Sequence, residues 1–267
     1  MSNFSDYIGG GGSASYPTIF LHNSQTWVPP QDGNILIHVI GAGGSGSASN
    51  NVAQLESGAA GGYCRKNSLA VTTSGSFTVV VGAGGASTFN AAGAGTAGGN
   101  STVAGTGLGS TLTATGGAGG ALANNTFTTG GTASNGDVNY AGGRGGYQKG
   151  GGAVGLTGTG NDGLTTGSTT NLGGDCDILG DFYSSSFGQL SGSGGGRGFA
   201  PSDKGPGNPV AGPLAGGGGI YKASVSTLVA GHASIGGGGG WCYYATYADS
   251  LNSGRGGEGC VVIQYIP

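Results

Sequence analysis

Glycine tracts with a period of three are the feature that most constrains the fold of this chain. Glycine makes up 68 of the 267 residues, far above its ordinary share of about 7%. Within the tracts the other side chains lie three positions apart, as in GAGGSG (41–46), GAGGAS (82–87), GGAGGA (116–121), GGRGGY (142–147) and GRGGEG (254–259). A flexible Gly/Ser linker needs no such register, so we expect the tracts to be ordered.

Three residues per turn is the period of a polyproline-II-type helix, whose N–H and C=O groups point outward and make no bonds within the helix. Two glycines per turn would let neighbouring backbones approach and hydrogen-bond, while the third residue would face outward. The period therefore predicts a packed sheaf of polyglycine-II-type helices. Collagen also has this period but requires abundant proline, whereas this chain has eight prolines.

The first tract also spells G-x-G-x-x-G after the apolar segment 34–40, which is the pattern of a dinucleotide-binding turn. Such a site needs a helix after the third glycine and an acidic residue about 20 positions later. Residues 45–51 are polar and poor helix formers, and no acidic residue stands where the ribose would need one. Because strand-then-glycine patterns recur at 77–87 and 111–121, we interpret them as architecture and expect no cofactor.

Strand-like segments cluster before residue 120 and return at the end of the chain. We predict strands at 35–40, 68–71, 76–81, 101–103, 111–115 and 259–267. Helical periodicity is absent, so the predicted fold is all-β with almost no α-helix. The first and last strands are expected to pair and to close a small β-sandwich.

Three regions follow from this pattern. We expect a separate N-terminal segment over residues 1–30, the β-sandwich with its glycine tracts over 31–120 and 259–267, and the sheaf with its connecting loops over 121–258. Charged residues make up 7% of the chain, the net charge is −3, and no basic stretch is present, so nucleic acid is not an expected partner. No apolar run approaches 18 residues, so membrane insertion is not expected either.

No catalytic or metal-binding pattern stands out. His38 alternates within a predicted strand and is interpreted as structural. Asp175 and Asp177 flank Cys176, but a calcium site would need more oxygen ligands. The cysteines form no C-x-x-C pair, so we expect buried or free thiols and no zinc site, with disulfide pairing left open. They are Cys64, Cys176, Cys242 and Cys260. We therefore expect that the protein is not an enzyme and that it binds no cofactor and no metal.

Several segments, in this order, resemble the glycine-rich domain of bacteriophage tail and tail-fibre proteins. They are TWVPPQDGNILIHVIGAGGSG, GAAGGYCRKNSLAV, SFTVVVGAGG, GNSTVAG, LTATGGAGG and GGEGCVVIQYI, which together run from Thr26 to Ile266. The alternating tracts and loops in the middle are similar, more loosely, to the receptor-binding adhesins at the tips of T-even-type phage long tail fibres. In those adhesins, packed polyglycine helices display variable loops that touch the bacterial surface.

The resemblance implies a fibre-tip or receptor-binding protein of the virion, made in the host cytoplasm. Its loops in 121–258 would face the receptor, a host cell-surface protein or glycan. Its N-terminal segment would contact other tail or fibre proteins, and a homotrimer is one assembly we consider. The alternatives are a purely structural virion protein, such as a tail component or capsid decoration, and an ice-binding protein. Irregular aromatic loops and the missing secretion signal disfavour ice binding.

Aromatic residues gather in two segments between glycine tracts. Tyr and Trp are enriched at binding hot spots, but they would equally serve to plug the ends of a sheaf without side chains, and the sequence favours neither role. These candidate receptor contacts are Trp241, Tyr243, Tyr244, Tyr247, Phe182, Tyr183 and Phe187. Arg144 and Tyr147 lie within a tract, so we expect them on an exposed outer face.

Overall fold

The computed structural model describes residues 16–49, 55–89, 92–122, 127–146, 158–160, 162–163, 220–222, 227–229, 233, 235–239, 242–244 and 250–267. Within these residues the chain is all-β and contains no helix, as predicted. The strands are β1 (Thr18–Leu21), β2 (Gln25–Trp27), β3 (Gly33–Ile40), β4 (Ala48–Ser49), β5 (Tyr63–Val71), β6 (Phe77–Val80), β7 (Ser101–Gly105), β8 (Leu112–Ala114), β9 (Ala133–Ser134), β10 (Val138–Tyr140), β11 (Ile220–Lys222), β12 (Thr227–Val229), β13 (Cys242–Tyr244), β14 (Ser250–Asn252) and β15 (Cys260–Ile266).

Two antiparallel five-stranded sheets form a β-sandwich. One sheet has the order β1-β15-β3-β5-β10 and the other β2-β6-β7-β8-β9. The final strand, β15, lies between β1 and β3 and pairs with both. The predicted closure of the sandwich by the first and last strands is therefore confirmed.

The sandwich core follows from the alternation of apolar residues in its strands. In β3, Ile35, Ile37 and Val39 point into the core between the sheets, while Ile40 belongs to a second cluster on the other face of the same sheet. Residues of both sheets contribute to the inner core, among them Phe77 of β6. Period-two alternation is the signal of a half-buried strand, which explains why the strand predictions succeed.

Strand β5 is longer than the sequence pattern predicts. It begins at Tyr63, whereas apolar residues alone indicate a strand over 68–71. The extra residues pair with β3 across an irregularity between Ile35 and Ile37. They include Arg65 and Lys66, which are half-buried, so neighbouring backbone and not hydrophobic pattern extends the strand.

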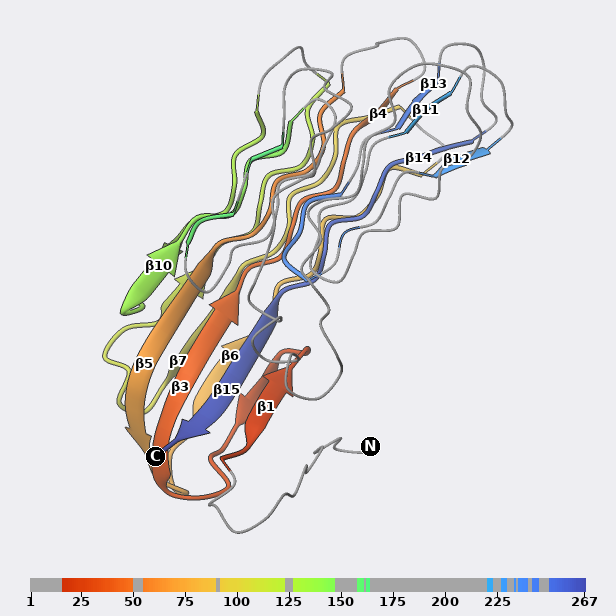
Figure 1. The fold of residues 1–267 in the computed structure, drawn as a ribbon. Coiled ribbons are helices and arrows are strands. Elements are labelled where there is room, and N and C mark those ends of the chain that lie inside the picture. Colours follow the sequence, from red (N-terminus) through yellow and green to blue (C-terminus); the bar gives the residue numbers. More distant parts are fainter. Residues whose placement is uncertain are drawn as a thin grey trace.

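The glycine tracts form a second body that extends from one end of the sandwich (Figure 1). We call it the glycine bundle; it consists of residues 41–48, 55–62, 82–88, 93–99, 115–121, 128–132, 141–146, 236–239 and 254–259. Every sandwich strand except β1 and β2 runs directly into, or out of, one of these tracts. The strand order of the two sheets therefore sets the arrangement in which the tracts enter the bundle.

Hydrogen-bond partners in the bundle change with every residue and return every third residue. The tract 41–48 shows the repeat most completely: N–H groups of Gly41, Gly44 and Ser47 bind carbonyls of tract 56–62, those of Ala42, Ser45 and Ala48 bind tract 93–99, and those of Gly43 and Gly46 bind tract 254–257, with N···O distances of 2.8–3.1 Å. Carbonyls of the same tract accept bonds from three further tracts, at Gly85, Gly239, Gly117 and Gly120. The tract thus has six hydrogen-bonded neighbours.

Tract 56–62 has the same three-residue repeat. Its N–H groups at Glu56, Ala59 and Gly62 bind tract 115–121, those at Ser57 and Ala60 bind tract 141–146, and those at Gly58 and Gly61 bind tract 236–239. This repeat is the one that three residues per turn would produce. That the tracts are polyglycine-II-type helices stays a prediction, because it rests on the hydrogen-bond repeat alone.

The expected outward direction of the third residue holds for the peripheral tracts and is wrong for the central one. Ala83, Arg144 and Arg255 are exposed between buried glycines. Ala42 and Ser45, by contrast, are completely buried. Their tract is surrounded on all sides, so no direction faces solvent, and only small side chains fit there.

Glycine is required in the bundle because neighbouring backbones touch where a side chain would begin. A Cβ atom built on Gly117 would lie closer than 3.0 Å to the carbonyl oxygens of both Ala59 and Ala60. A Cβ on Gly256 would meet the backbone of Gly43 and Gly44 in the same way. These close approaches exclude larger residues at both positions.

Candidate functional site

The described tracts run away from the sandwich, and we call the end of the bundle opposite the sandwich the distal end (Figure 1). Its described part contains the three-stranded sheet β11-β13-β4 and the two-stranded sheet β12-β14. All pairings in these two small sheets are parallel. They bring segments near residues 48, 220 and 242 together, although these are far apart in sequence.

The structure describes the backbone position of two of the seven predicted contact residues. Tyr243 and Tyr244 lie in β13, so this part of the expected aromatic loop is a strand. In the register of the sheet, Tyr243 stands between Tyr221 of β11 and Ser49 of β4. β13 forms a strand here because it pairs with β4, which continues directly from the central tract 41–48. The other five candidates, Trp241, Tyr247, Phe182, Tyr183 and Phe187, lie outside the described residues.

Phe89 is a distal aromatic residue that the sequence analysis missed. It is 72% exposed, more than any other large hydrophobic residue whose burial the structure describes. It forms an antiparallel bridge with Asn252 at the end of β14. The signal in the sequence is weak, because Phe89 is a lone aromatic between two glycine tracts, whereas the predictions were drawn from aromatic clusters.

The backbone around Phe89 is held on both sides. Thr88 donates its N–H to the Ser253 hydroxyl (3.0 Å), and its carbonyl accepts the N–H of Ser253 (3.2 Å). Ser253 is completely buried. On the other side, Gly93 and Ala48 exchange two N–H···O bonds of 2.8 and 2.9 Å. Thr88 before the ring and Gly93 after it are thus bonded to Ser253 and to Ala48.

Arg144, predicted on an outer face, is exposed and joins two neighbouring segments. Its guanidinium donates two hydrogen bonds to Oδ2 of Asp162 (2.6 and 2.8 Å), and its backbone N–H donates to Oδ1 (2.8 Å). The guanidinium carbon also lies 4.3 Å from the ring centre of Phe127. Burial opposes ionisation of Asp162, but the bonds and charge of Arg144 prevail and lower the pKa of that carboxyl. These contacts identify a structural clamp. Tyr147, the other residue of this prediction, lies outside the described part.

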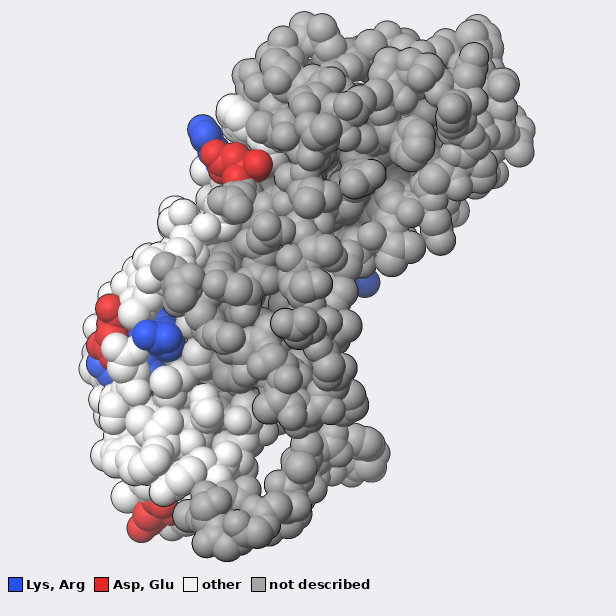
Figure 2. Space-filling view, in the orientation of Figure 1, with Lys and Arg blue, Asp and Glu red and all other residues white. Residues whose placement is uncertain are grey.

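The described exposed charges of the bundle occur as opposite pairs. One pair is Arg144 with Asp162, and the other is Arg255 with Glu258. Glu258 also accepts the N–H of Gly84 at 2.8 Å. Figure 2 shows how few charged side chains the described surface carries on one face. A bundle surface with paired charges offers recognition through shape and neutral groups.

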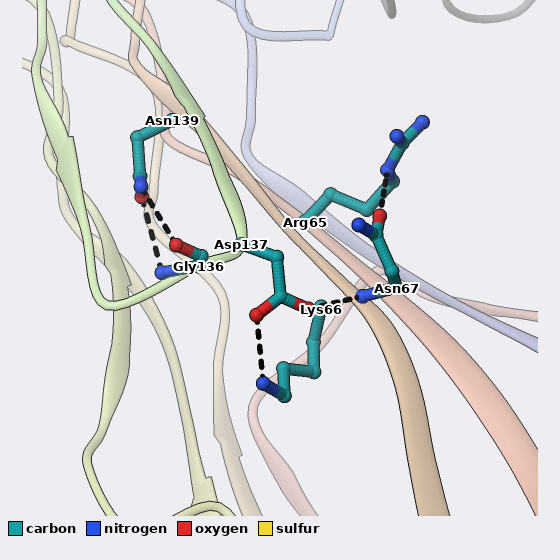
Figure 3. A network of polar contacts seen from close by, with 6 residues as sticks. All are labelled: Arg65, Lys66, Asn67, Gly136, Asp137 and Asn139. Atoms are coloured by element: carbon teal, nitrogen blue, oxygen red, sulfur yellow. Dashed lines mark hydrogen bonds and ion pairs between the residues drawn. The ribbon is translucent and has the colours of Figure 1, made fainter.

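A polar network on the sandwich fixes the turn between β9 and β10 (Figure 3). Asp137 accepts the ammonium of Lys66 and the backbone N–H of Asn67, both at 2.8 Å. The hydrogen bond from Lys66 and that from Asn67 lower the pKa of Asp137. Asn135, with a φ of 65°, turns the chain at this point. The network is an exposed structural one and holds no groups aimed at a common ligand.

His38 is buried and hydrogen-bonded, in agreement with its structural interpretation. Its Nδ1 lies 2.7 Å from the hydroxyl of Tyr63. Burial, and to a smaller extent the charge of Arg65, lower the pKa of His38 to about 3. The imidazole is therefore neutral at physiological pH.

Cys64 and Cys260 are buried free thiols, as expected. Burial raises the pKa of each thiol to about 12. They belong to clusters on opposite faces of the same sheet, Cys64 in the inner core and Cys260 in the outer cluster. Side chains on opposite faces of a sheet point apart, so these two thiols are not placed to pair.

In the ranges given above, no group of three or more His, Cys, Asp or Glu residues could hold a metal ion. Asp175, Cys176 and Asp177 lie outside those ranges. The described part of the chain has no helix with the length and apolar character needed to cross a membrane.

Comparison with known proteins gives a family match over nearly the whole chain. A family model described as a glycine-rich domain matches residues 18–266. No curated protein matches the sequence. The matched region includes both sheets of the sandwich and the tracts of the bundle.

Proposed function

The chain belongs to the glycine-rich domain family, and from the resemblance of its segments to phage tail and tail-fibre proteins we propose that it acts as a bacteriophage tail-fibre tip or receptor-binding protein. In this proposal the distal loops contact the surface of the bacterial host, and the sandwich end connects to the rest of the tail. The glycine tracts are polyglycine-II-type helices that hold the loops in place. The proposed location is the virion.

The observation that carries the proposal is the division of the molecule into a sandwich end and a loop end. Eight sandwich strands continue into, or out of, tracts, and the short strands β4, β11, β12, β13 and β14 lie at the distal end (Figure 1). Variation of exposed residues at this end would leave the hydrogen bonds of the sandwich and bundle unchanged. A protein that must fit different surfaces benefits from this separation of scaffold and contact.

Stiffness of the scaffold also favours a binding role. Tract 41–48 is bonded to six neighbours, so the loops that it carries start from fixed positions. A loop fixed before binding loses less conformational entropy when the partner docks. A glycine bundle has few side chains of its own, so binding would depend on the loops.

The sandwich end suits attachment because the early and late parts of the chain meet there. β1 pairs with β15, and the N–H of Tyr265 donates to the carbonyl of Pro17 at 3.1 Å. A connection to other tail proteins through the N-terminal segment would leave the molecule at this end. The distal loops would then point away from the tail.

The test is binding of the purified, fluorescently labelled chain to whole bacteria of many species, measured by flow cytometry. We expect saturable binding to a restricted set of strains, and we expect unlabelled protein to compete. Protein added in excess should also slow adsorption of a phage that carries it. Absence of binding across a broad panel would contradict the proposal and favour a purely structural virion component.

A further inference from the structure

We propose that Phe89 is a receptor-contact residue whose ring stacks on a sugar of an uncharged bacterial surface polysaccharide. This inference rests on the proposed function and adds the chemical class of the receptor. It concerns a residue in the first half of the chain, outside the two aromatic segments that the sequence singles out.

The first argument is the exposure of Phe89 in a fixed frame. The side chain is 72% exposed, while its neighbours Thr88 and Ser253 are hydrogen-bonded in both directions. An exposed aromatic ring on a fixed backbone loses little entropy when a partner covers it.

The second argument is the group that stands beside the ring. Phe89 and Asn252 face each other in an antiparallel bridge. Directly opposed residues of such a pair place their side chains on the same face, with Cβ atoms about 5 Å apart. The aromatic ring can pack against the C–H groups on one face of a sugar, and the amide beside it can donate and accept hydrogen bonds with the sugar hydroxyls.

The third argument is charge. The exposed charges of the described bundle are paired with opposite charges, Arg144 with Asp162 and Arg255 with Glu258. The polar side chain opposite Phe89 is the neutral amide of Asn252, and the adjoining hydroxyls of Thr88 and Ser253 are buried and also neutral. Nothing in this set would compensate a phosphate or carboxylate, so an uncharged saccharide fits better than an acidic one.

The experiment uses the full chain on an array of purified bacterial polysaccharides, both uncharged O-polysaccharides and acidic capsular ones. Wild-type protein should bind at least one uncharged polysaccharide, with less than about twofold change in affinity between low and high salt. Phe89→Ala should weaken binding on the order of tenfold or more, and Phe89→Trp should retain it. The matched control is Val80→Ala, since Val80 is also exposed (41%) but lies on the sandwich. All variants should melt at the wild-type temperature.

The same proteins are applied to whole cells, before and after treatment of the cells with protease. If the wild type binds cells but no polysaccharide, and protease abolishes that binding, the receptor is a protein and this inference fails while the proposed function stands. If Phe89→Ala binds as the wild type does, or if only acidic polysaccharides bind, the inference fails as well. If the wild type binds neither cells nor polysaccharides, both proposals fail.

Discussion

Replacement of Gly117 by alanine gives a direct test of the bundle, because a linker and a packed tract predict different changes in stability. In a linker that stays flexible in the folded protein, Gly→Ala restricts the folded and the unfolded chain alike, so the free energy of unfolding should hardly change. In the structure, a Cβ at this position would lie closer than 3.0 Å to three backbone atoms of Ala59 and Ala60. Backbone atoms cannot turn aside as the end of a flexible side chain can, so one tract must move.

The size of the effect follows from the bonds that such a movement would break. Tract 115–121 accepts three N–H bonds from tract 56–62, donated by Glu56, Ala59 and Gly62. Ordinary carbon–oxygen contact requires a shift of roughly 1 Å, which exceeds the range of a good hydrogen bond. Each buried donor left without a partner costs about 1–3 kcal/mol, or about 3–9 kcal/mol for all three. This is comparable to the whole stability of an ordinary domain.

Urea denaturation followed by far-UV circular dichroism measures the effect. Gly117→Ala should lower the midpoint strongly or give insoluble protein, and Gly117→Val should do so more severely. The matched control is Gly158→Ala, because a Cβ there meets nothing within 4 Å. A Gly117→Ala variant as stable as the control would refute the packed bundle and restore the linker interpretation.

Three further predictions concern charge and contact. Acid should destabilise the fold, because between pH 6.5 and 3 His38 is protonated in the unfolded chain but not in the folded one. The free energy of unfolding should therefore fall by about 1.4 kcal/mol per pH unit below pH ~5.5. His38→Phe should reduce that slope in urea titrations. A slope unchanged by the substitution would contradict this. Asp137→Asn, which removes the exposed ion pair with Lys66, should cost less than about 1 kcal/mol, and a loss of several kcal/mol would show a larger role. Replacing Trp241, Tyr243 and Tyr244 together with Ser should abolish adsorption to host cells without unfolding the protein; normal adsorption by the folded variant would exclude this segment, and loss of folding would identify the three as plugs.

The strands and their closure could be predicted because the sandwich obeys a local rule. Alternating residues in β3 and β15 face the inner core on one side and the outer cluster on the other. That alternation is visible in the sequence without knowledge of the partner strands. The start of β5 at Tyr63 could not be predicted in this way, because pairing with β3 extends it through polar residues.

The period of three in the tracts could also be recognised, but the period alone does not say how many neighbours a tract has. GAGGSG at 41–46 and GAGGAS at 82–87 have the same spacing. Only the first is enclosed, so Ala42 is buried while Ala83 is exposed. The position of a tract in the bundle depends on where its strand lies in the two sheets of the sandwich, and that order is a property of the whole topology.

The candidate site is hard to predict from sequence for a related reason. Residues that meet at the distal end adjoin separate tracts, as Phe89 and Asn252 do, and no local pattern links them. The hydrogen bonds of the tracts are made by backbone atoms of closely packed chains, so the same requirement for glycine applies at many positions. Substitution should therefore be tolerated at an exposed site such as Phe89 and penalised at a buried glycine such as Gly85, where a Cβ would meet neighbouring backbone. A chain built in this way can change what it contacts by altering a few distal residues, while its core stays made of backbone.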